Sequence, residues 1–178
     1  MSQPDQRSAY QERLKQLLNS VSNLKPPVRI KKKTSSNLFR YQGRQNQNSS
    51  FVSLQNFNHV LYLDQENQTL EVEGLATYEQ IGDYSLKFGF LPLVAHELKH
   101  ITIGGATVGI GIESTCFKYG FVHDGLIEAD IFLPGGRVVS VSADNQYADL
   151  HRALPNSYGS LGYILRAKIK LHPAKPFV

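Results

Sequence analysis

Apolar residues recur with a helical period along the first part of the chain. They fall on one stripe of a helix, at Tyr10, Leu14, Leu17, Leu18 and Val21. The pattern therefore predicts one amphipathic helix from about Pro4 to Asn23. The pair Pro26-Pro27 ends it, because proline removes a backbone donor and disfavours helix before it. We treat residues 1–26 as an N-terminal helical segment.

After this segment the apolar positions alternate in shorter, strand-like runs. A short strand is predicted at Val28–Lys33, followed by the polar turn Thr34–Asn37. The run YQGRQNQNSS at 41–50 has no period and predicts a mobile loop. Further along we expect a hairpin of Asn58–Leu63 with Thr69–Glu73. A helix is predicted from Thr77, with Gln80 completing a capping box, to Gly89. Extended chain at Phe90–Val94 and a polar loop at Ala95–His100 follow.

The last third reads mainly as strands. Leu126–Leu133 and Arg137–Val141 alternate on either side of the turn Pro134-Gly135-Gly136, which predicts a second hairpin. A short helix at Tyr147–Leu154 and a final strand at Gly162–Leu171 follow. Strands outnumber helices and do not alternate with them as βαβ units, so the fold class is α+β.

Composition narrows the class of protein without identifying it. The chain has 178 residues, 41% hydrophobic and 19% charged, as expected of a globular protein with one core or two small subdomains. No apolar run approaches the roughly 20 residues of a membrane span, and the N-terminus lacks a secretory pattern. The single cysteine, Cys116, excludes an internal disulfide and favours a cytoplasmic location.

The net charge of +4 is concentrated near the front of the chain. The basic cluster comprises Arg29, Lys31, Lys32, Lys33, Arg40 and Arg44. It fits either a solvated strand edge protected by lysines or direct contact with a phosphorylated ligand. Aromatic residues are not interleaved with these charges, so we predict no nucleic-acid partner.

The main candidate for chemistry is the glycine-rich run Thr102–Ser114, TIGGATVGIGIES. It holds four glycines within eight positions: Gly104, Gly105, Gly109 and Gly111. Glycine lets a ligand approach the main chain, and consecutive N–H groups can form an anion nest that suits a pyrophosphate. Hydroxyl donors are available from Thr102, Ser114 and Thr115.

Three interpretations of the run compete. A Rossmann fingerprint needs a helix after the glycines and an acid about 20 residues on; Asp130 fits, but Phe117–Asp124 has weak helical character. A Walker loop is excluded, because no Gly-Lys-Ser/Thr triplet follows. A pair of tight turns between strands, with no ligand, stays open.

The surrounding motifs favour a dinucleotide. The chain resembles the FAD-binding domain of the vanillyl-alcohol-oxidase/p-cresol-methylhydroxylase (PCMH) superfamily. The matching motifs are ELKHITIGG, GIGIES, KYG and NSYGSLGY, together with KKKTSSNLFR and LEVEGLATYEQI. The resemblance is nearest to the delta-24 sterol reductase branch and its bacterial relatives, and covers roughly residues 28–175. It implies a PCMH-type domain over residues 27–175, with FAD between two α+β subdomains, the first of them shortened.

The resemblance also implies site residues. The FAD-binding stretch comprises Thr102, Ile103, Gly104, Gly105, Ala106, Gly109, Gly111, Ile112, Glu113 and Ser114. A later strand contributes Gly162, Tyr163 and Ile164. A turn near the phosphates contributes Ser35, Ser36 and Asn37. Glu113 fits a bond to ribose or flavin and a turn-stabilising role equally well. His96 stands where relatives often carry proline, so the approach to the flavin is expected to differ there.

We expect the flavin to be held non-covalently. Covalent attachment in this superfamily uses a histidine in the first loop or a cysteine ahead of the Gly-Gly pair, and neither is present. Cys116 follows GIGIES and is interpreted as a small buried hydrophobe. The six histidines lack metal-site spacing, so no metal is predicted, and His123-Asp124 has no nucleophile nearby in sequence.

The activity that the resemblance implies is hydride transfer through FAD in an oxidoreductase. In the nearest branch this is NADPH-dependent reduction of a sterol side-chain double bond. Relatives continue past the final strand into a substrate-binding, or cap, domain, which we expect this chain to lack, so a separate cap domain is a possible partner. The alternative is a non-catalytic flavin-binding or interaction module.

Overall fold

The computed structural model describes residues 5–22, 24–25, 28–31 and 50–175. The expected turn at Ser35, Ser36 and Asn37, most of the basic cluster and the expected loop at 41–49 lie outside these residues.

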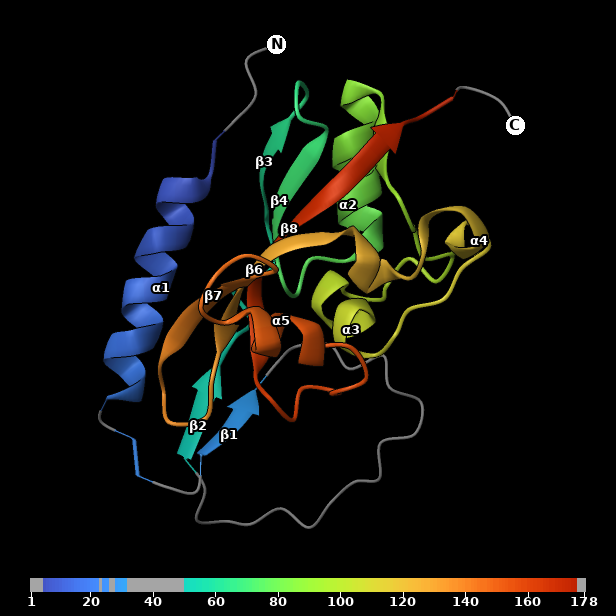
Figure 1. Ribbon diagram of the computed structural model, residues 1–178. Helices are drawn as coiled ribbons and strands as arrows, with labels where there is room; N and C mark the ends of the chain where they lie inside the picture. Colours follow the sequence, from blue (N-terminus) through green and yellow to red (C-terminus); the bar gives the residue numbers. More distant parts are fainter. Residues whose placement is uncertain (1–4, 23, 26–27, 32–49, 176–178) are drawn as a thin grey trace.

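A mixed arrangement of strands and helices is seen in Figure 1. The main sheet is antiparallel and has the order β3-β4-β8-β6-β7, with β5 paired to the end of β8. Its strands are β3 Val60–Asp64, β4 Thr69–Glu73, β5 Phe90–Pro92, β6 Leu126–Phe132, β7 Val138–Ser142 and β8 Tyr163–Pro173. A separate parallel pair joins β1 Val28–Lys31 to β2 Ser50–Ser53. The predicted α+β class is confirmed.

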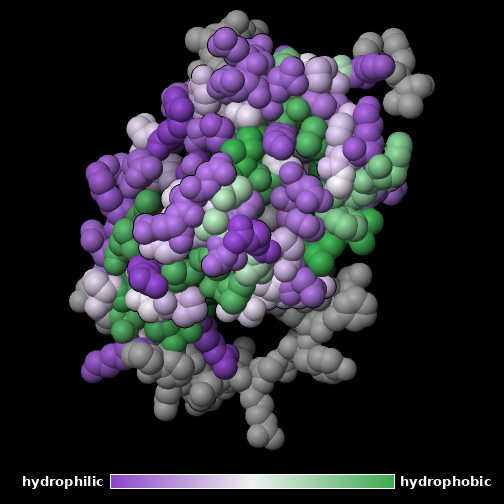
Figure 2. Space-filling view, viewed as in Figure 1, coloured by the Kyte–Doolittle hydropathy of each residue, from purple (hydrophilic) through white to green (hydrophobic). Residues whose placement is uncertain are grey.

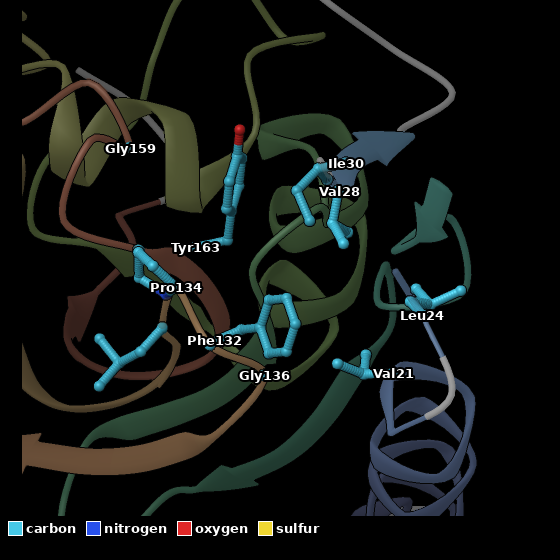
Figure 3. A pocket seen from close by; sticks show the side chains of 12 residues that line it. Val21, Leu24, Val28, Ile30, Phe132, Pro134, Gly136, Gly159 and Tyr163 are labelled. Atoms are coloured by element: carbon cyan, nitrogen blue, oxygen red, sulfur yellow. The ribbon is translucent and has the colours of Figure 1, made fainter. Parts of the chain in front are cut away.

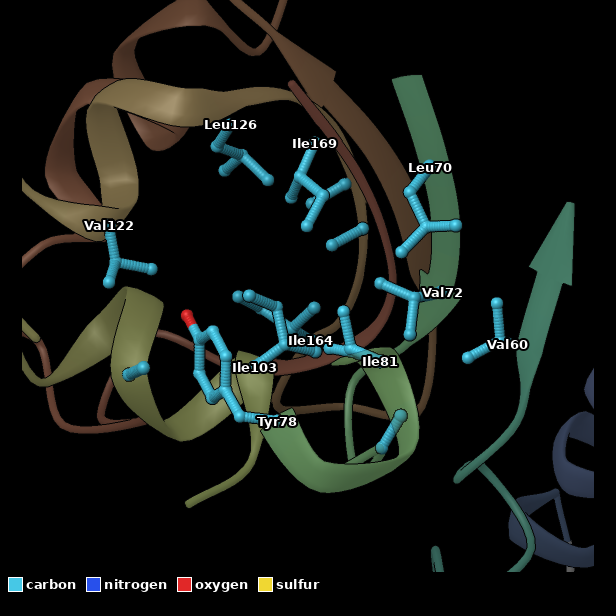
Figure 4. Packing of buried hydrophobic residues seen from close by; sticks show 14 of the residues in the cluster. Val60, Leu70, Val72, Tyr78, Ile81, Ile103, Val122, Leu126, Ile164 and Ile169 are labelled. Atoms are coloured by element: carbon cyan, nitrogen blue, oxygen red, sulfur yellow. The ribbon is translucent and has the colours of Figure 1, made fainter. Parts of the chain in front are cut away.

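Both faces of the main sheet are covered. The helices are α1 Arg7–Val21, α2 Tyr78–Ser85, α3 Ile103–Val108, α4 Cys116–Tyr119 and α5 Ala148–Ala153, with the 3-10 turns η1 Leu86–Phe88 and η2 Val122–Gly125. One core cluster joins α2 and α3 to the sheet; in Figure 4, Tyr78, Ile81 and Ile103 point toward the strand residues Val72 and Ile169. A second cluster joins α1, through Tyr10 and Leu17, to β2 and β8.

Most elements with a strong local signal form where the pattern predicts them. Both hairpins, the first helix and the final strand are present. At α2, Gln80 N donates to Thr77 Oγ1 over 3.3 Å and Thr77 N donates to Gln80 Oε1 over 2.9 Å, which is the predicted capping box. Gly89 ends the following turn with φ +79°. The predicted helix at Tyr147–Leu154 is α5.

Two elements differ from the prediction. Ser50 opens β2, although the sequence predicts loop there, because β2 forms through pairing of Ser50–Ser53 with β1 rather than through a local pattern. The glycine-rich run, expected to be a loop, contains the helix α3. Tertiary packing outweighs the weak helix propensity of Gly104 and Gly105, since α3 is anchored on Gly74.

A cluster of buried charges joins α1 to the sheet. Arg166 of β8 bonds Asp130 over 2.8 Å and Glu71 over 3.1 Å, and also contacts Glu128. The Tyr10 hydroxyl of α1 donates to Asp130 Oδ2 over 2.6 Å. Only 12% of the Arg166 side chain and 11% of that of Asp130 are exposed. We call these five residues the Arg166 network.

The contact of Tyr10 with this network predicts a loss of stability in alkali. Burial, together with the Asp130 carboxylate, raises the pKa of Tyr10 far above its ordinary value of about 10. The folded protein therefore keeps a proton that the unfolded chain loses above about pH 10, and its stability falls as the pH rises further. Urea unfolding from pH 8 to 11 should show a shallower decline for Tyr10→Phe than for the wild type. Burial also raises the pKa of Tyr78, but Tyr78 is present in both proteins and cancels in the comparison. An equal decline of stability with pH in the two proteins would contradict the role of Tyr10.

Candidate functional site

The start of α3 is fixed by close backbone contact. Gly104 N donates to Gly74 O over 2.9 Å, and a Cβ at Gly104 would lie 2.7 Å from that oxygen. A Cβ at Gly74 would in turn lie 1.9 Å from Ile164 O of β8. These two glycines let α3 pack on the backbone of Gly74, and let Gly74 pack on the backbone of β8. Packing alone thus requires glycine at position 104.

The first N–H groups of α3 have partners within the chain. Ile103 N donates to Ala76 O over 3.0 Å, Gly105 N to Thr102 Oγ1 over 3.2 Å and Ala106 N to Thr102 O over 2.9 Å. The expected anion nest therefore does not lie at positions 103–106. These N–H groups position the helix, and the accessible part of the glycine-rich run lies on the other side of α3.

The accessible side of α3 is formed largely by glycine. Gly105 is exposed, Gly109 is half-buried, and a Cβ at Gly105 would meet only Thr102 Oγ1, at 3.0 Å. Tyr158 N donates to Val108 O over 3.1 Å, so the Tyr158 ring lies 3.8 Å from the Cβ position of Gly109. A ligand can therefore approach the main chain closely here, beside an aromatic ring.

Large apolar side chains are exposed in α4 and in three loops, those before and after α3 and the one that carries Tyr158. Tyr158 is 72% exposed, Ile112 64%, Leu98 69% and Phe117 91%. Figure 2 shows hydrophobic residues gathered over α4 and the chain that precedes it. Exposed apolar groups beside an accessible glycine backbone are typical of a site for a flat aromatic ligand or a packed partner.

The turn after α3 is held by a buried histidine and a carboxylate. His96 Nδ1 lies 2.6 Å from Glu113 Oε1, and Glu97 N donates to the same oxygen over 3.2 Å. Of the two interpretations of Glu113, these contacts support the turn-stabilising one. Ser114 is exposed. Cys116 is half-buried rather than buried, but it packs against the first core cluster as a small hydrophobe does, and its Sγ accepts a hydrogen bond from Glu113 N over 3.2 Å.

Two residues of the second predicted group, Gly162 and Tyr163, border an apolar cavity of about 460 Å³. Val28 and Ile30 of β1 face Phe132 and Tyr163 across it in Figure 3. Gly162 is at the wall with φ +155°, where a Cβ would lie 2.8 Å from Phe132 O. Ile164, the third residue of this group, does not line the cavity, and its side chain is buried in the first core cluster.

One loop connects the two groups of predicted residues. Its residues Asn156, Tyr158 and Gly159 all have positive φ, at 63°, 49° and 82°. Tyr158 packs on Gly109, whereas Gly159 lines the cavity with Gly162. Tyr158 and Gly159 were not predicted to belong to the site. The motif NSYGSLGY, which contains both, was the available signal.

Between residues 5 and 175, leaving aside the gaps given above, no group of His, Cys, Asp and Glu is arranged to hold a metal ion. Within the same ranges, no helix has the length and apolarity to cross a bilayer.

Comparison with known families identifies the domain. The sequence model of the family described as FAD binding domain matches residues 9–142. The chain belongs to this family. This FAD-binding domain is 35% identical to the Delta(24)-sterol reductase of Pisum sativum over 127 residues, which are 71% of this chain and 22% of that protein. It is 33% identical to the Homo sapiens Delta(24)-sterol reductase over 123 residues, 69% of this chain and 24% of that protein.

Solved structures confirm the fold. 6-Hydroxy-D-nicotine oxidase from Arthrobacter nicotinovorans superposes on 90% of this chain and 33% of its own, with TM-score 0.64 and 17% identity. Glucooligosaccharide oxidase from Acremonium strictum superposes on 72% of this chain and 26% of its own, with TM-score 0.63 and 19% identity. The resemblance to the PCMH-type FAD-binding fold is thus confirmed, and the chain spans less than a quarter of the sterol reductases' length.

The residues of the FAD-binding domain fit the cofactor that gives the family its name. FAD has two aromatic ends joined by a ribityl-pyrophosphate chain, and this domain offers two apolar sites joined by one loop. An accessible glycine backbone at Gly105 and Gly109 borders the first, and Gly162 and Tyr163 border the second. A cavity of about 460 Å³ lies within the range of small-ligand sites of roughly 300–1,000 Å³.

Proposed function

We propose that this FAD-binding domain holds FAD non-covalently and serves a flavin-dependent oxidoreductase. Bound FAD supplies hydride transfer, whereas the protein supplies binding, orientation and electrostatics. The observation that carries the proposal is the glycine-built accessible side of α3, bordered by Tyr158 and Ile112, in a chain that matches the FAD binding domain family.

Each apolar site has a role in this proposal. The backbone at Gly105 and Gly109 admits the cofactor to contact distance, and the Tyr158 and Ile112 side chains cover its ring system. The cavity at Tyr163 takes the adenosine end, because its walls are apolar and suit a flat base. The backbone of Gly162 closes that cavity without a side chain that would fill it.

Non-covalent binding is supported by the nucleophiles near the site. Cys116 is half-buried, and its Sγ accepts a hydrogen bond from Glu113 N. The Nδ1 of the exposed His100 lies 3.8 Å from the carboxylate of Glu79 in α2. Only 8% of the His96 side chain is exposed. Cys116 and His96 are thus engaged within the fold, and His100 lies toward Glu79 of α2.

The substrate side of the proposal rests on the relatives. Because the sterol reductases are more than four times as long as the matched segment, we propose that a cap-type domain, on the same polypeptide or another, supplies the substrate groups. The reaction would then resemble reduction of a sterol double bond. We also propose a cytoplasmic location, because the unpaired Cys116 fits a reducing compartment.

A reconstitution experiment tests cofactor and linkage together. The purified chain is incubated with FAD, passed through a desalting column, and denatured with acid. We expect flavin absorption in the protein fraction before denaturation and free FAD in the supernatant afterwards. Riboflavin, which lacks the adenosine diphosphate half, should bind more weakly. Failure to retain or titrate FAD would overturn the proposed function, whereas flavin precipitating with the protein would overturn non-covalent binding only.

A further inference from the structure

His96 occupies a tight space under the glycine-rich run. Its ring packs edge-on against Tyr78 of α2, with 5.0 Å between ring centroids. On the other side, a Cβ at Gly111 would lie 2.2 Å from His96 Nε2, so glycine is required opposite the imidazole. Only 8% of the His96 side chain is exposed, and Nε2 has no hydrogen-bond partner among the described residues. The imidazole is thus aimed at the run and held there.

The Glu113 carboxylate joins this histidine to the turn. Its Oε1 lies 2.6 Å from His96 Nδ1 and accepts from Glu97 N over 3.2 Å. The loop that carries His96 and the chain that follows Gly111 are thereby tied at one atom. Burial raises the pKa of Tyr78 far above its usual value, with the Glu113 charge adding to the effect, so the neighbouring phenol stays neutral.

The segment held in this way has a strained residue at its centre. Ile110 has φ +53°, a left-handed conformation that a β-branched residue adopts only where its surroundings enforce it. Gly111 N donates to Ala106 O over 2.8 Å, which closes the turn on the helix side. The His96–Glu113 contact restrains the other side. Between these restraints, the turn presents Ile112 outward beside the accessible side of α3.

We propose that His96 and Glu113 are positioning residues that hold the turn 109–113 in the conformation that FAD binds. Neither residue touches the cofactor; they act through the backbone of Gly111 and Ile112. Because the contacts that hold the turn all lie within the chain, FAD binding does not have to supply them. The inference rests on the proposed function, since it assigns a role to the turn at that same site.

The first test compares FAD dissociation constants, measured by flavin fluorescence on the 178-residue chain. His96→Leu should weaken binding at least tenfold. His96→Asn, whose amide N–H can replace Nδ1–H as the donor to Glu113, should stay within threefold of the wild type. The double variant of His96→Leu with Glu113→Leu should bind no more weakly than either single variant, because the two residues act as one unit. His100→Leu, in the same loop but exposed, is the control and should bind normally.

A second readout does not depend on FAD. Amide hydrogen exchange of residues 109–114 in the cofactor-free protein should be accelerated at least tenfold by His96→Leu and restored by His96→Asn. Adding Ile110→Asn to His96→Leu should recover part of the FAD affinity, because asparagine adopts positive φ more readily than isoleucine. A histidine that only filled space would show neither the local exchange effect nor this rescue.

The outcomes separate the two proposals. If the wild type does not bind FAD, the proposed function fails, and the exchange measurements still test how the turn is held. If the wild type binds FAD and His96→Leu binds it within threefold with unchanged exchange at 109–114, the positioning role of His96 is overturned while the proposed function stands.

Discussion

Replacing Gly105 by tryptophan is expected to abolish FAD binding and to leave the domain folded. Gly105 is exposed on α3, and the nearest atom to a Cβ there is Thr102 Oγ1 at 3.0 Å, the end of a short side chain. The indole would cover the backbone at Gly109 and fill the space beside Tyr158. We expect at least a hundredfold loss of affinity, about 2.7 kcal/mol, in a fluorescence titration with FAD.

Two other glycine substitutions serve as controls for this result. Gly82→Trp places the same side chain in α2, where no atom lies within 4 Å of the Cβ, and should keep FAD binding. Gly104→Ala, unlike Gly105→Trp, should lower the stability of the domain, because the new Cβ would lie 2.7 Å from Gly74 O. Overpacking of this kind costs about 1–3 kcal/mol and would appear in the melting temperature. Normal FAD binding by a folded Gly105→Trp protein would refute the placement of the cofactor on α3.

The contrast between Gly104 and Gly105 also shows what the sequence could predict. Four closely spaced glycines indicated close backbone approach, which is confirmed at Gly104, whereas approach of a ligand at Gly105 stays a prediction. The pattern could not say which partner approaches, since Gly104 meets the backbone of Gly74, 30 positions earlier, whereas Gly105 faces solvent. Elements with local signals, such as the capping box of Thr77 and Gln80, could be predicted from the sequence because their partners are three residues apart.

Elements made by distant contacts could not be predicted in this way. Strand β2 depends on pairing with β1, which precedes it by about 20 positions. Extended chain at Phe90–Val94 was predicted correctly, but its pairing with the end of β8 could not be. Tyr158 belongs to the candidate site only because its loop packs on α3. The role of Glu113 stayed open in the sequence for the same reason, because its partner His96 lies in another loop.

The Arg166 network should account for a large part of the stability of the domain. Arg166→Ala would leave Asp130, Glu71 and Glu128 without their shared guanidinium, between α1 and the sheet. Breaking a buried ion pair by removing one partner costs about 3–5 kcal/mol, a large share of the roughly 5–15 kcal/mol that stabilises a typical domain. For a chain of this size we expect the melting temperature to fall by roughly 6–20 °C.

The pH dependence distinguishes an electrostatic effect from lost packing. Although burial alone would raise the pKa of Asp130, the hydrogen bonds and charge of Arg166 hold it below its ordinary value. A lowered pKa in the folded state gives stability that is present above about pH 4 and is lost as the pH falls through the folded-state value. The difference between the wild type and Arg166→Ala should therefore shrink in acid. Arg152→Ala, which removes an exposed arginine paired with Asp149, should change stability by at most about 1 kcal/mol at any pH. A constant difference across the pH range would mean that Arg166 acts through its packing, and the buried charges would then not hold α1 on the sheet.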